Sequence, residues 1–145
     1  MISYWGFMSS EVYQLIYISE PVAGIAELLD MVSQAQRFNL AKQISGILIV
    51  KNKSVFQLLE GPEKEVKALY DKIKKDKRHQ NPQIIYEGHA SFRNIPFLGM
   101  ALTIDFEESD DDRKIYLFDK KEAIKFSQLI QGPVQEYLLS YLDRS

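Results

Sequence analysis

Three neutral hydrogen-bonding side chains stand among apolar residues: Tyr17, Asn39 and Gln57. Gln57 lies between Phe56 and Leu58, inside an apolar and β-prone run. Because an unpaired buried amide costs roughly 1–3 kcal/mol, Gln57 either faces water or has a hydrogen-bonding partner in the core. Tyr and Gln both donate and accept, and Asn offers two donors and an acceptor. This set suits a neutral heterocycle with carbonyl and ring-nitrogen edges; satisfaction by local partners within an ordinary core is the alternative.

Other chemistries lack the residues that they need. Cysteine is absent, which excludes disulfides, thiol nucleophiles and cysteine-bound metals. The two histidines, His79 and His89, fall in different expected elements, so the sequence indicates no metal pair. No glycine-rich phosphate loop occurs. An acylphosphatase would need an arginine in the loop at residues 18–25, and that loop has none.

Size and composition predict one globular domain with a sizeable core, since the chain has 145 residues, of which 46% are hydrophobic and 26% charged. The net charge is −2 and no long basic stripe occurs, so we expect no nucleic-acid partner. No apolar run reaches about 20 residues, and the N-terminus does not resemble a signal peptide. We therefore expect no membrane partner and a cytoplasmic location.

A β-hairpin is expected near the middle of the chain. Two apolar, β-prone runs at residues 47–50 and 55–59 flank a polar link at residues 51–54. The polar link tolerates turn geometry while the apolar runs are buried. Gln57 therefore lies on the second strand of this hairpin.

Periodicity predicts the other elements. Residues 12–19 form a nearly continuous apolar strand, and apolar residues at helical spacing follow at about 23–37. A polar loop is expected at 37–43. After the hairpin, Pro62 suits the start of a second helix, because it has no N–H to leave unsatisfied. A polar loop is expected at 76–82, and two further strands are predicted at residues 83–91 and 98–106.

This β-α-β-β-α-β-β order predicts an α+β, ferredoxin-like fold, with a mixed sheet and both helices on one face. A flat ligand could fit between the helices and the sheet. We expect an N-terminal extension at residues 1–11, one domain at 12–106 and a C-terminal helical extension at 107–145. Two alternatives stay open at each end: residues 1–10 dock or are disordered, and residues 113–118 form a helix or a strand.

The C-terminal extension contains two stretches with the pattern of amphipathic helices, at residues 120–130 and 134–142, broken at Gly132-Pro133. The second has its apolar residues at helical spacing. It either covers an exposed face of the sheet or forms an interface with another molecule, and the spacing alone favours neither.

Six stretches recur in an order and spacing typical of a known family. They are Tyr-Gln-Leu-Ile-Tyr-Ile-Ser (13–19), Ala-Gln-Arg-Phe-Asn (35–39), Ile-Ser-Gly-Ile-Leu (44–48), Phe-Gln-Leu-Leu-Glu-Gly (56–61), Asp-Lys-Arg-His (76–79) and Met100. Together, over roughly residues 12–105, they resemble the BLUF family of blue-light sensors. The resemblance implies a ferredoxin-like, flavin-binding domain at residues 12–106, with FAD as the cofactor and FMN as the alternative.

The resemblance also implies roles for the three polar residues. Tyr17 matches the tyrosine that donates an electron and a proton to the excited flavin. Gln57 matches the glutamine between that tyrosine and the N5/O4 edge of the flavin. Asn39 matches the asparagine that binds the O4/N3 side, and Met100 matches a methionine of the fifth strand that passes on the signal.

Further matches surround the ring and its side chain. Met31 and Ile73 match apolar residues that flank the ring from the two helices. Arg78 and His79 match a basic pair near the O2 edge or the side chain of the flavin, and Asp76 matches a residue that supports their loop.

The chain departs from the family pattern at two positions. Lys72 stands where some relatives have an arginine near the phosphate, and a lysine supplies a point charge without the bidentate fork. A tryptophan is usual at the position of Leu98, so we expect a different signal through the fifth strand or an altered lifetime of the signalling state.

The expected function is that of a short photoreceptor, not an enzyme, which acts through an unidentified protein partner or as a homo-oligomer. One alternative is a flavin-dependent redox enzyme, although the sequence supplies no nicotinamide site. The other is an interaction module that has the fold and no pigment. The visible absorption of the purified protein separates these functions.

Overall fold

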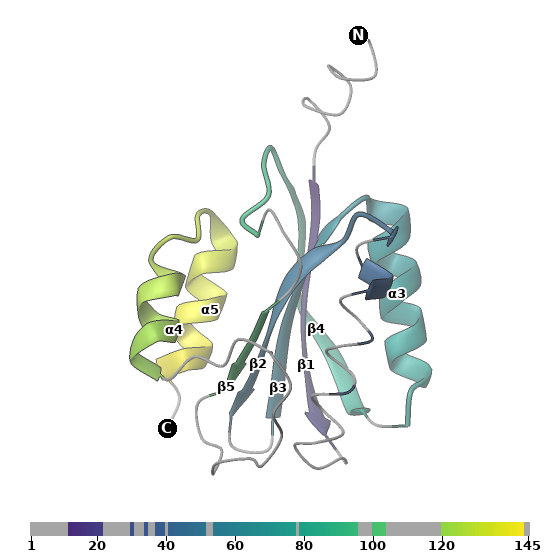
Figure 1. Ribbon diagram of the computed structural model, residues 1–145, viewed down its shortest axis with the longest axis horizontal. Coiled ribbons are helices and arrows are strands. Elements are labelled where there is room, and N and C mark those ends of the chain that lie inside the picture. The colour runs from purple at the N-terminus through teal and green to yellow at the C-terminus, as the bar shows by residue number, and fades with distance from the viewer. Residues whose placement is uncertain are drawn as a thin grey trace, which may run out of the picture.

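The computed structural model describes residues 12–21, 30, 34, 37–39, 41–51, 54–77, 79–95, 100–103 and 120–143. The elements in chain order are β1 (Val12–Pro21), β2 (Ser45–Lys51), β3 (Ser54–Gly61), α3 (Glu63–Lys75), β4 (His79–Ala90), β5 (Met100–Thr103), α4 (Lys120–Ser127) and α5 (Pro133–Asp143). Figure 1 shows the sheet between α3 on one side and the pair α4 and α5 on the other. This arrangement confirms the predicted α+β class.

The sheet has five strands in the order β4-β1-β3-β2-β5. Strand β1 pairs with β3 and β4 in antiparallel fashion, and β2 pairs with β3 in the same way. Strand β5 is parallel to β2 and forms one edge. The sheet is therefore mixed and ferredoxin-like with one extra strand, and the β2–β3 hairpin confirms the prediction for the middle of the chain.

Each face of the sheet has its own hydrophobic core, because side chains alternate between the faces along a strand. The α3-face cluster comprises Tyr13, Leu15, Tyr17, Ile44, Leu59, Val66 and Tyr70. The α5-face cluster comprises Ile16, Ile47, Ile49, Phe56, Leu58, Ile95, Ile130, Val134, Leu138, Tyr141 and Leu142. Strand β3 contributes to both, with Leu59 on one side and Leu58 on the other.

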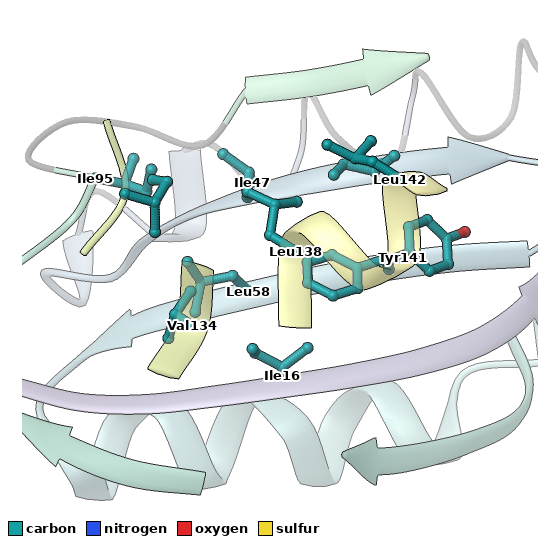
Figure 2. Close-up of a cluster of buried hydrophobic side chains, with 11 residues drawn as sticks. Ile16, Ile47, Leu58, Ile95, Val134, Leu138, Tyr141 and Leu142 are labelled. Carbon is teal, nitrogen blue, oxygen red and sulfur yellow. The ribbon is translucent and has the colours of Figure 1, made fainter. Parts of the chain in front are cut away.

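Helix α5 covers the sheet face that lies opposite α3 (Figure 2). Its buried residues Val134, Leu138 and Leu142 recur every four positions and pack against the same cluster as Ile16 and Leu58. Full burial of such an aliphatic side chain contributes about 1.5–3 kcal/mol. Of the two roles that the sequence left open for this helix, covering the sheet is the one that the structure shows.

Helix α3 presents an apolar side to the sheet and has charges that suit its dipole. Val66 and Tyr70 are buried, one turn apart. The first turn holds Glu63 and Glu65, and the last turn holds lysines, so that acidic residues lie near the positive end and basic ones near the negative end. The helix ends where the backbone N–H of Asp76 donates to the Ile73 carbonyl at 3.1 Å.

The predictions of two loops, at residues 37–43 and 76–82, were partly wrong. Strand β4 begins at His79, so the polar loop expected at 76–82 ends before that residue. Pro82 is tolerated in this strand because β4 is at the edge of the sheet and its pairing with β1 is irregular there, between the pairs Ile18–Gln83 and Glu20–Gln80. Residues 37–39 and 41 are helical, although a loop was expected at 37–43.

Other predictions fall only partly within the described residues. Residues 30 and 34 are helical, in agreement with the helix predicted at 23–37. Strand β5 occupies residues 100–103 of the strand predicted at 98–106. The predictions for residues 1–10 and 113–118 lie outside the described ranges, and the domain boundaries stay predictions.

Candidate functional site

Tyr17 and Gln57 are brought together by neighbouring strands. They are directly paired between β1 and β3, so their side chains leave the same face of the sheet. The Tyr17 hydroxyl donates a hydrogen bond to Oε1 of Gln57. Tyr17 is fully buried, and Gln57 is half-buried. The apolar run around Gln57 is therefore compatible with its amide, because a buried phenol partners it.

The environment of Tyr17 keeps its phenol protonated. Burial raises the pKa of Tyr17 well above its ordinary value, and the nearby Tyr70 and Asp76 raise this pKa further. The Tyr70 ring of α3 lies against the Tyr17 ring, with 5.4 Å between centroids and a tilt of 55°. In the resting protein, Tyr17 is thus a proton donor and not a phenolate.

Asn39 leaves a buried acceptor unpaired. Its side chain is 3% exposed, and Oδ1 has no hydrogen-bond partner among the described residues. Its backbone carbonyl accepts from the N–H groups of Lys42 and Ile44 at 3.2 and 2.8 Å, which fixes the turn that carries it. An unpaired buried acceptor costs about 1–3 kcal/mol, so this position suits an N–H group of a ligand.

Helix α3 brings Lys72 and Ile73 toward the same region. The Lys72 ammonium lies 4.3 Å from the ring centroid of Phe38, the residue before Asn39. Ile73 is half-buried and packs against the α3-face cluster. Asp76 is half-buried at the end of the helix and contributes to the electrostatic surroundings of Tyr17.

Four expected site residues are not placed as side chains. Met31 and Arg78 lie outside the described residues, as does Leu98, the position at which the chain departs from the family pattern. His79 begins β4 and Met100 begins β5, where only their backbone positions are described. Their roles, and the contacts of the other expected residues with a ligand, stay predictions.

The sequence did not predict two contacts of the site, that of Tyr70 with Tyr17 and that of Phe38 with Lys72. Helical spacing places Tyr70 on the apolar side of α3, but spacing along one helix does not identify the strand residue that it contacts. Phe38 stands within the motif at 35–39, and its position beside Lys72 depends on how two separate elements pack. Only three-dimensional packing reveals either contact.

The described ranges hold no group of three or more His, Cys, Asp or Glu side chains that could bind a metal ion. In the same ranges, no helix is long and apolar enough to span a bilayer.

Comparison with known proteins agrees with this arrangement. Residues 12–101 match the family described as "BLUF: Sensors of blue-light using FAD". A curated relative from Escherichia coli (strain K12), "Blue light- and temperature-regulated antirepressor BluF", is 40% identical over 102 residues, which are 70% of this chain and 24% of the relative. The chain thus spans about a quarter of that relative's length.

Solved structures share the fold. The photo-activated state of BlsA has a TM-score of 0.65 at 20% identity and covers 92% of this chain and 96% of its own. The BLUF domain of BlrP1 has a TM-score of 0.67 at 23% identity, with 92% and 88% coverage. Klebsiella pneumoniae BlrP1 with FMN and cyclic diGMP has a TM-score of 0.70 at 20% identity, with 90% and 34% coverage.

The family match covers more than half of the chain, and the matched range, residues 12–101, includes the hydrogen-bonded pair of Tyr17 and Gln57. The chain therefore belongs to the BLUF family of blue-light sensors, whose domains bind a flavin.

Proposed function

We propose that the chain is a blue-light receptor that holds its flavin on the α3 face of the sheet, next to Tyr17 and Gln57. Two observations support this location. Oδ1 of Asn39 is buried without a partner among the described residues, and the half-buried amide of Gln57 accepts from the Tyr17 hydroxyl through Oε1 and carries a donor, Nε2, on the same group. These groups fit the carbonyl and ring-nitrogen edge of a flavin. When bound, the flavin would supply blue-light absorption and a strongly oxidising excited state.

Other residues would bind around this edge. Ile73 from α3, with Met31, would flank the ring. Lys72 would supply a positive charge near a phosphate, together with Arg78 and His79, in keeping with FAD and also compatible with FMN.

Tyr17 is the proposed electron donor. Loss of an electron makes a phenol strongly acidic, whereas burial holds the pKa of the neutral phenol high. The proton therefore leaves with the electron. The hydrogen bond from the Tyr17 hydroxyl to Oε1 of Gln57 is the observation that carries this proposal, because it gives the proton a path. Gln57 can relay it, since an amide both accepts and donates.

The reaction is proposed to be reversible. The electron and the proton return to Tyr17, and Gln57 remains rotated or tautomerised with a changed hydrogen bond toward the ring. A changed hydrogen bond at this edge shifts the absorption slightly to the red. Because no substrate is consumed and no product remains, the chain acts as a receptor and not as an enzyme.

The signal is proposed to pass to another protein. The E. coli relative is described as a regulated antirepressor, a role that needs a protein partner. This chain would act on a partner or through a homo-oligomer, without contacting nucleic acid or membrane, and the cytoplasmic location expected from composition stays a prediction.

The visible absorption spectrum of purified protein, before and after a blue flash, tests the function. A flavin spectrum that shifts slightly to the red and recovers in darkness supports the receptor. A flavin spectrum that only bleaches favours redox chemistry instead. A protein that stays colourless after flavin is supplied would contradict the proposal and leave an interaction module.

A further inference from the structure

Glu60, near the end of β3, is a fully buried carboxylate. It stands three residues after Gln57 and faces the opposite side of the sheet, toward α5. Its Oε2 accepts hydrogen bonds from Nε2 of Gln14 at 2.7 Å and from the backbone N–H of Asn94 at 3.0 Å. Its Oε1 accepts from the N–H of Ile95 at 2.7 Å. A buried charge is costly unless it is hydrogen-bonded, so Glu60 holds the turn after β4 firmly to β3.

Arg93 strengthens this attachment. Its guanidinium donates to Oγ of Ser45 at 3.0 Å, to the backbone carbonyl of Glu60 at 3.2 Å and to that of Gln43 at 2.5 Å. Partial burial lowers the pKa of Arg93, while the nearby Glu60 raises it. Residues 93–95 are thus bound to the ends of both β2 and β3.

Asn94 extends the connection to the C-terminal helices. Its Nδ2 donates to the carbonyl of Gln131 at 3.1 Å, and the N–H of Gln131 donates to its Oδ1 at 2.9 Å. Gln131 lies in the turn between α4 and α5. Beside it, the fully buried Ile95 packs in the α5-face cluster with Val134 (Figure 2).

We propose that this Glu60–Asn94–Gln131 link is the connection through which β3 positions the α4–α5 turn and transmits a change at Gln57. Glu60 and Asn94 are then positioning residues for the output of the light reaction. The inference rests on the proposed function, because Gln57 starts the change. A strand held by ladder bonds on both sides moves as one piece, so a shift at Gln57 reaches Glu60, and reciprocal hydrogen bonds pass it to the turn.

The test compares Asn94→Ala with Gln131→Ala in the full-length protein. Asn94→Ala removes both side-chain bonds to the turn and leaves its backbone N–H on Glu60. Gln131→Ala is the matched control, because Gln131 takes part only through its backbone and its side chain is exposed. The measurements are the flash-induced red shift and amide hydrogen exchange of residues 131–143 in darkness and in light.

In the wild type, we expect light to change the exchange of these amides. Asn94→Ala should keep the red shift and reduce that light-dependent difference about fivefold or more, the factor for loss of one ordinary hydrogen bond. Gln131→Ala should match the wild type. Three outcomes would overturn the link. One is a light-dependent change of amide exchange in Asn94→Ala as large as in the wild type, and another is an equal reduction of that change in both variants. The third is a wild type that shows the red shift but no light-dependent change of exchange.

A dark measurement separates this link from the proposed function. Without light, exchange of the Gln131 N–H should be about fivefold faster in Asn94→Ala than in the wild type. It should also be faster in Glu60→Gln, because the new amide NH₂ group replaces an oxygen that accepts hydrogen bonds and would face an N–H donor. Unchanged exchange in Asn94→Ala overturns the link whatever the flavin does. A wild type without a red shift but with these dark effects would contradict the light-driven part and the proposed function, and leave the mechanical connection in place.

Discussion

The contact between Tyr17 and Gln57 depends on the register between β1 and β3. The two residues are Cα partners in this ladder, so their side chains emerge from one face. A slip of one residue would move one of them to the other face, where the α5-face cluster lies.

The phenol and the amide could be predicted from the motifs at 13–19 and 56–61, whereas the contact of Tyr70 with Tyr17 could not, because it depends on where α3 crosses the sheet.

Gln57→Leu should retain the flavin colour and lose the light-induced red shift. Leucine fills a similar space and removes the amide that accepts from Tyr17. Absorption before and after a flash checks this, with Gln83→Leu as the control, since Gln83 is an exposed glutamine on β4. A normal shift in Gln57→Leu would refute the relay.

Tyr70→Phe should behave like the wild type, and Tyr70→Leu should not. The ring of Tyr70 packs against Tyr17 at 5.4 Å, and phenylalanine keeps that ring. Leucine leaves space beside Tyr17, which should cost about 1–3 kcal/mol of stability and reduce the flash-induced shift. Urea unfolding and flash spectroscopy measure the two effects; equal behaviour of the variants would show that Tyr70 does not position Tyr17.

At the scale of elements, β3 connects the two cores. Gln57 and Leu59 face α3, whereas Leu58 and Glu60 face α5. The apolar, β-prone run made this strand predictable from the sequence. The side chains that pack against each of its two faces were not predictable, because they come from distant elements. The early start of β4 was missed because Pro82 is compatible with an edge strand, and edge position becomes known only from the order of the whole sheet.

Gly46→Ala should destabilise the β2–β3 pair strongly. A Cβ at Gly46 would lie 1.9 Å from the backbone carbonyl oxygen of Leu58, which cannot move without the strand. We expect a loss of about 3 kcal/mol or more, at the upper end for overpacking. Gly88→Ala is the control, because its Cβ would meet the hydroxyl end of the flexible Tyr86 side chain at 2.5 Å. Thermal unfolding should rank Gly46→Ala far below Gly88→Ala, and equal midpoints would contradict this account.

A chain that ends at Asp119 should aggregate. Without α4 and α5, the side chains of Ile16, Phe56 and Leu58 on the sheet would be exposed to water. Sedimentation velocity compares the shortened chain with the full one. Unchanged assembly and solubility would count against the covering role of α5.

At the scale of the molecule, each face of the sheet is closed by helices, and β1 carries two tyrosines that are buried on the α3 face. Tyr13 and Tyr17 are 4% and 0% exposed. Burial raises the pKa of both phenols above their ordinary value, and for Tyr13 the hydrogen bond to Glu87 adds to the effect. In the unfolded chain the same two phenols ionise near pH 10, whereas in the folded protein they stay protonated to higher pH.

Stability should consequently fall at alkaline pH. Since the folded pKa values are raised, the contribution of these phenols is complete below about pH 10 and is lost as the pH rises toward the folded values. Each buried tyrosine adds a slope of about 1.4 kcal/mol per pH unit in that range. Chemical denaturation between about pH 10 and 11 measures this slope, and Tyr17→Phe should reduce it by most of one such share. An unchanged slope would show that Tyr17 ionises normally in the fold.

The pairing of β1 has a consequence for the kinetics of folding. Its contacts bridge long stretches of chain: Tyr17 meets Gln57 across 40 residues, and Tyr13 meets Glu87 across 74. Contacts of this separation form slowly, because a long loop must close before they are gained. During synthesis, β1 leaves the ribosome before β3 and β4, and its apolar residues must wait for both strands. Chaperone dependence and yield at high expression temperature should therefore be governed by β1, the strand that also carries Tyr17.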